Sequence, residues 1–68
     1  MSTDYLAKVI EEQKELKAKL DRLTAFNDSD KVQKLTESHR KLLIEQEHCM
    51  LQYNATLLAR IELMQQEN

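Results

Sequence analysis

The chain has 68 residues, of which 32% are charged, and ten Lys and Arg against twelve Asp and Glu give a formal net charge of -2. One domain over 1–68 is expected, and a chain of this length forms only a small core, which usually needs additional support. The single cysteine, Cys49, cannot form an internal disulfide, so the support is expected from association with a second chain. The charge balance argues against direct nucleic-acid binding. No apolar run approaches the ~20 residues of a membrane span.

The first predicted helix runs from about 4 to 26. Its apolar positions recur at alternating spacings of three and four, which is the pattern of a helix that packs along one side. The positions in this pattern are Leu6, Val9, Gln13, Leu16, Leu20 and Leu23, among which Gln13 is the polar one. The resulting stripe is narrow, so one partner helix is enough to cover it.

A break is predicted after this helix, where polar turn-forming residues gather in a chain that has no glycine and no proline. Asn27 is expected to end the helix in a left-handed conformation. Ser29 or Asp30 would then cap a short helical turn over 29–35, and Thr36 would cap the next helix. The alternative is one straight helix from 30 onward.

The second predicted helix runs from about 37 to 65 and carries two apolar stripes, which together span about 200° of its circumference. The first stripe holds Leu42, Leu43, Cys49, Met50, Tyr53, Leu57, Ile61 and Met64. The second holds Ile44, Leu51, Ala55 and Leu58, and Glu47 and Asn54 lie between the two. One helix cannot cover so wide an arc.

These patterns predict an all-α fold, an antiparallel helical hairpin that pairs with a second copy into a dimeric four-helix bundle. In the alternative arrangement, the 29–35 segment folds back over part of the open stripe with Val32 and Leu35. Gln13 and Gln46 are expected to meet across the two helices and to fix their register.

No catalytic, cofactor or metal site is predicted, and the chain is not expected to be an enzyme. His48 and Cys49 are adjacent, so on a helix they point about 100° apart and cannot readily share a metal. No glycine-rich phosphate loop and no nucleophile–base pair is present. Function is therefore expected to lie in binding. The predicted partner-binding or dimer-interface residues are Ile44, Leu51, Tyr53, Leu58 and Arg60.

Two runs of residues resemble a family of short all-helical proteins of tailed bacteriophages and prophages, with relatives in crAss-like phages. The runs are Tyr5-Leu6-x-x-Val9-x-x-Glu12-x-x-Glu15-Leu16-x-x-Lys19-Leu20-x-x-Leu23-x-x-Phe26 and Leu42-Leu43-x-x-Gln46-x-x-x-Met50-x-x-Tyr53-x-x-x-Leu57-x-x-Arg60-Ile61. The resemblance covers Tyr5 to about Leu63. It implies a phage accessory protein that acts in the cytoplasm of an infected bacterium.

By analogy with a quorum-sensing anti-activator of a Pseudomonas phage, the expected function is inhibition of a host bacterial protein, such as a transcription regulator or a defence or pilus component. A coiled-coil adaptor for phage assembly is the alternative. A third hypothesis is a sponge for small nucleotide signals, which needs a cationic cavity between subunits. The basic cluster near the bend is its only sequence support: Lys31, Lys34, Arg40 and Lys41.

Overall fold

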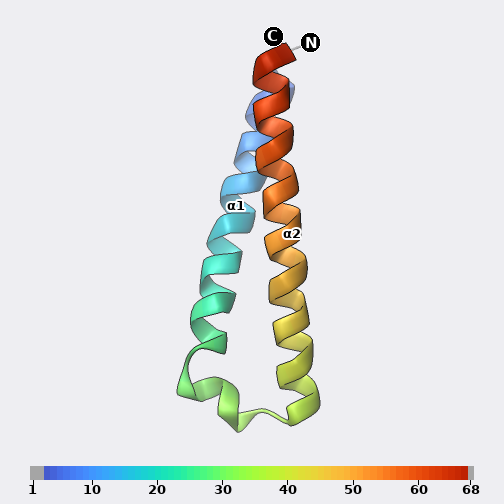
Figure 1. The fold of residues 1–68 in the computed structure, drawn as a ribbon. Coiled ribbons are helices and arrows are strands. Elements are labelled where there is room, and N and C mark those ends of the chain that lie inside the picture. Colours follow the sequence, from blue (N-terminus) through green and yellow to red (C-terminus); the bar gives the residue numbers. More distant parts are fainter. Residues whose placement is uncertain (1–2, 68) are drawn as a thin grey trace.

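The computed structural model describes residues 3–67 as two long antiparallel helices joined by a short helical turn (Figure 1). Helix α1 spans Thr3–Asn27, the 3-10 helix η1 spans Asp30–Lys34, and helix α2 spans Glu37–Glu67. The hairpin is a rod of 48 × 14 × 13 Å, and the beginning of α1 and the end of α2 lie together at one end of it. The predicted all-α hairpin is confirmed, and each long helix continues slightly beyond its predicted last residue.

Hydroxyl groups shape the connection between the long helices, as predicted. The Ser29 Oγ accepts a hydrogen bond from the Lys31 backbone N–H at 3.2 Å and donates one to the Phe26 carbonyl at 2.7 Å. The Thr36 Oγ1 accepts from the His39 N–H at 3.2 Å and so caps α2. Leu35 between them is extended, with φ -89° and ψ 160°. The alternative of one straight helix from 30 onward is therefore wrong.

The predicted left-handed conformation of Asn27 is also wrong. No residue in the described range 3–67 has a positive φ, and Asn27 is the last residue of α1. Its side chain bonds to α2, while the backbone N–H of Asp28 still donates to the Thr24 carbonyl at 3.1 Å. The chain therefore leaves α1 without the αL residue that commonly ends a helix.

The core is small and lies along the line where α1 and α2 meet. The buried apolar side chains are Val9, Leu16, Leu20, Val32 and Leu57. Leu57 is fully buried against Val9 and Leu16, and Met50, Ile61 and Met64 pack around this cluster. Because so few side chains are fully enclosed, each one contributes a large share of the stability of a chain this short.

Candidate interaction surfaces

The contact line between the helices follows a seven-residue repeat on both of them. On α1 the positions of this repeat, all buried or half-buried, are Leu6, Val9, Gln13, Leu16, Leu20, Leu23 and Asn27. On α2 the positions of the repeat, again all buried or half-buried, are Leu43, Glu47, Met50, Asn54, Leu57, Ile61 and Met64. Glu47 and Asn54 therefore belong to the contact with α1. The prediction that placed them between two separately covered stripes has to be corrected accordingly.

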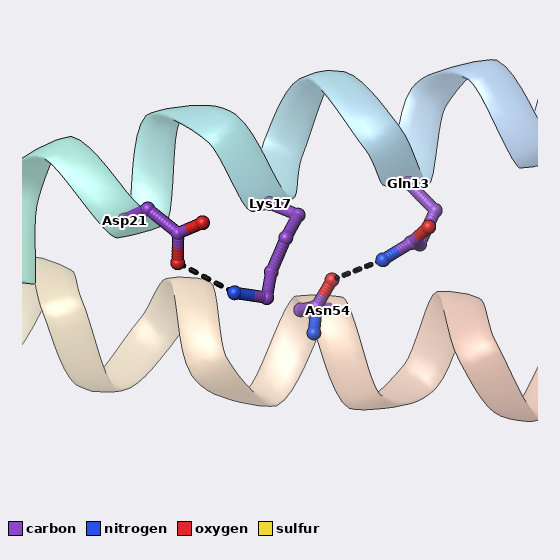
Figure 2. A network of polar contacts seen from close by, with 4 residues as sticks. All are labelled: Gln13, Lys17, Asp21 and Asn54. Atoms are coloured by element: carbon purple, nitrogen blue, oxygen red, sulfur yellow. Dashed lines mark hydrogen bonds and ion pairs between the residues drawn. The ribbon is translucent and has the colours of Figure 1, made fainter.

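A polar pair crosses the contact line near its middle. The Gln13 Nε2 donates a hydrogen bond to the Asn54 Oδ1 at 3.0 Å, and both side chains are half-buried (Figure 2). The predicted meeting of Gln13 with Gln46 is wrong, because Gln46 is exposed on α2 and its amide lies 3.8 Å from the Met50 sulfur. In the observed register, Asn54 faces Gln13 in place of Gln46.

A second polar contact ties the end of α1 to α2. The Asn27 Nδ2 donates to the Glu47 Oε1 at 2.8 Å and to the Leu43 carbonyl at 3.3 Å. Figure 2 also shows Lys17 and Asp21, an exposed ion pair along α1, and a pair of this kind contributes only a few tenths of a kcal/mol. The hydrogen bonds that Gln13 and Asn27 donate to α2, in contrast, fix the register of the two helices.

Replacing Gln13 with leucine is expected to lower the free energy of unfolding by about 1 kcal/mol, because the half-buried Asn54 amide loses its partner. The double variant Gln13→Leu/Asn54→Leu should regain most of that loss. Urea denaturation followed by circular dichroism measures both. Gln46→Leu is the matched control and should change stability by less than about 0.5 kcal/mol. A larger loss from Gln46→Leu than from Gln13→Leu would contradict the observed register.

The five predicted interaction residues divide between the two sides of the contact line. Ile44, Leu51 and Leu58, here called the leucine face, are 49%, 48% and 48% exposed. They lie on one side of the contact line, next to Glu47, Asn54 and Ile61 of α2. The alternative in which the 29–35 segment covers this stripe is not what the structure shows. The buried residue of η1 is Val32, and the leucine face stays open in the described chain.

Tyr53 and Arg60 lie on the other side of the contact line, next to Met50 and Leu57 of α2. There the Arg60 Nη2 donates a hydrogen bond to the Tyr5 hydroxyl at 2.7 Å, and the guanidinium carbon lies 6.0 Å from the centre of the Tyr5 ring. Tyr5 and Tyr53 are 44% and 45% exposed. We call Tyr5, Tyr53 and Arg60 the tyrosine–arginine edge. Tyr5 was not among the predicted site residues, because only the antiparallel register reveals that it reaches Arg60.

Three members of the first predicted stripe are exposed, so that part of the prediction is wrong. Leu42 and Tyr53 are 62% and 45% exposed, and Cys49 is a free, exposed thiol. Leu42 and Cys49 lie about 100° around α2 from Leu43 and Met50. A single helix such as α1 is too narrow to reach them.

Two further observations concern chemistry and membranes. Within residues 3–67, no three His, Cys, Asp or Glu side chains are grouped so that they could hold a metal ion. None of the helices described there is long and apolar enough to cross a bilayer.

Comparison with known proteins finds a family that the chain matches. A family model described as Sequestin matches residues 3–63. No curated protein and no solved structure matches the chain. The matched range includes all of α1 and η1 and the part of α2 that carries both surfaces.

Proposed function

The chain belongs to the Sequestin family, and we propose that it acts without catalysis, by binding another molecule and keeping that molecule from its normal partner. The family name indicates sequestration but does not identify the molecule that is bound. The tyrosine–arginine edge supports the proposal, because it presents two half-exposed aromatic rings and a guanidinium on one side of a rigid hairpin. Tyr and Arg are the residue types most enriched among binding hot spots.

The proposed target is a host bacterial protein, held in the cytoplasm of a phage-infected cell. A rigid helix face suits this role, since helices dock into grooves or onto other helices through a few anchoring side chains. Arg60 is already positioned by its bond to Tyr5, so little side-chain entropy is lost when it binds. Inhibition would follow from occupation of the target's own binding surface.

Alanine at Tyr53 or Arg60 tests this proposal. A tagged wild-type chain is expected to capture one host protein from a bacterial lysate in a fixed ratio, and each variant should bind that protein at least about 30-fold more weakly. Arg22→Ala is the matched control, because it removes the same charge from an exposed position of α1 at the other end of the hairpin. Undiminished capture by both alanine variants would contradict the proposed site. Recovery of phage structural proteins alone would favour the assembly adaptor.

A small nucleotide signal is the second candidate, and the composition of the same edge favours it. Aromatic rings stack on bases, and a guanidinium binds phosphate through paired hydrogen bonds. The basic cluster near the bend is less suited to this role. There the Arg40 Nη1 already donates a hydrogen bond to the Leu35 carbonyl at 2.7 Å.

Thermal unfolding in the presence of a panel of cyclic mono- and dinucleotides tests this candidate. A ligand that binds the folded chain but not the unfolded chain should raise Tm in a concentration-dependent way. The rise should disappear in Arg60→Ala and persist in Arg40→Ala. No change in Tm with any member of the panel, or a rise that Arg40→Ala abolishes instead, would argue against nucleotide binding at the edge.

A further inference from the structure

The leucine face has the spacing of a self-complementary helix interface. We propose that a second copy of this chain covers it, with the two α2 helices antiparallel and Leu51 on the two-fold axis. Ile44 and Leu58 lie seven residues to either side of Leu51. In an antiparallel pair, Leu51 therefore meets Leu51 of the second copy, while Ile44 meets Leu58 of that copy at both ends. The inference goes beyond the proposed function and does not depend on it.

Charged residues beside the leucine face favour this orientation. Lys41, His48, Ala55 and Glu62 follow one another at the same seven-residue spacing along α2, on the side of the face away from α1. An antiparallel pair places Lys41 opposite Glu62 of the second copy, and the small Ala55 opposite His48. A parallel pair would instead place Lys41 against Lys41 and Glu62 against Glu62, which is destabilising.

The competing interaction of Lys41 is weak. The Lys41 ammonium lies 3.6 Å from the Glu37 carboxylate within the same helix, and both side chains are about three-quarters exposed, at 75% and 74%. Exposed pairs of this kind contribute little to stability. Lys41 is therefore available to a carboxylate of another chain.

Helix α1 extends the same surface. In the observed register, Ile10 and Lys17 lie on the leucine-face side of the contact line, and Ile10 is half-buried. Lys17 has Asp21 as an ion-pair partner, which offsets its charge. The side of the hairpin that a second copy would cover thus includes four branched aliphatic side chains, and the one lysine that α1 adds to it is paired with Asp21. The tyrosine–arginine edge lies on the other side and stays open in such a dimer.

Sedimentation velocity of the full chain tests self-association. A mass of about twice the 8.0 kDa of one chain is expected. Leu51→Glu should raise the dimer dissociation constant at least about 100-fold, because two carboxylates would meet on the axis. Leu63→Glu is the control, since Leu63 is 54% exposed away from the leucine face and this variant should remain dimeric. A monomeric wild-type chain would overturn the proposal, as would a dimer that Leu63→Glu disrupts and Leu51→Glu does not.

Single cysteines test the orientation without disturbing the fold. In a Cys49→Ser background, Leu51→Cys should form a disulfide-linked dimer under mild oxidation, because only the axial position meets itself. Ile44→Cys and Leu58→Cys should each crosslink poorly alone and readily when the two variants are mixed. Efficient self-crosslinking of Ile44→Cys would show a parallel pair and overturn the proposal. Absence of crosslinking at all three positions would do the same.

Discussion

Replacing Leu57 with alanine is expected to lower the free energy of unfolding by about 3 kcal/mol. Leu57 is the one described side chain with no exposed surface, and it packs against Val9 and Leu16 from the other helix. The substitution leaves a cavity that neighbouring side chains can fill only in part. For so short a chain this is a large fraction of the total stability.

Urea denaturation followed by the helical circular dichroism signal measures this loss. Leu63→Ala serves as the control, because it removes the same atoms from a side chain that is 54% exposed. The control should cost less than about 1 kcal/mol. Equal losses for the two variants would show that α2 does not turn Leu57 toward α1.

Replacing Asn27 with alanine should cost about 2 kcal/mol, the second-largest effect expected from a single substitution within the hairpin. The change removes the hydrogen bond to the Glu47 carboxylate and the one to the Leu43 carbonyl. Hydrogen bonds to charged groups contribute about 1.5–3 kcal/mol each, and the half-buried acceptors would lose their donor.

A double-substitution cycle separates the Glu47 contact from the rest of this loss. Asn27→Ala and Glu47→Ala, alone and together, should show a coupling of about 1 kcal/mol in chemical denaturation. Gln33→Ala, an exposed amide in η1, is the control and should be close to neutral. Additive losses from Asn27→Ala and Glu47→Ala would mean that the two side chains do not interact in solution.

The fold was largely predictable because its signals are local. The three- and four-residue spacing of Leu16, Leu20 and Leu23 identifies a helix with one packed side. Ser29 and Thr36 satisfy backbone N–H groups in the way that their hydroxyls favour. These preferences act over a few residues, so they require no knowledge of what packs against what.

The side of α2 that contacts α1 was harder to predict, because the apolar residues of α2 are not centred on that side. Glu47 and Asn54 are polar, yet they face α1 and bond to Asn27 and Gln13. Leu42, in contrast, is apolar and 62% exposed. A polar residue belongs on a contact line when a partner on the other helix satisfies it, and that partner becomes known only once the register is known.

The candidate site shows the same limit. All five predicted residues are at least partly exposed, but the sequence could not divide them between two surfaces. The division follows from the direction in which α2 faces α1. That direction puts Leu51 on one side of the contact line and Tyr53 on the other, and it brings Arg60 to Tyr5 across 55 residues of sequence.

The central claim is that the two sides of α2 serve different contacts, self-association on the leucine face and capture on the tyrosine–arginine edge. Native mass spectrometry of the tagged chain, purified gently from bacterial cells that supply the target, tests it most directly. The prediction is a species with two copies of the chain plus an added bound mass, and this mass disappears in Arg60→Ala while the two copies remain. A species with one copy of the chain and the bound mass would contradict the claim, because no second copy would then cover the leucine face.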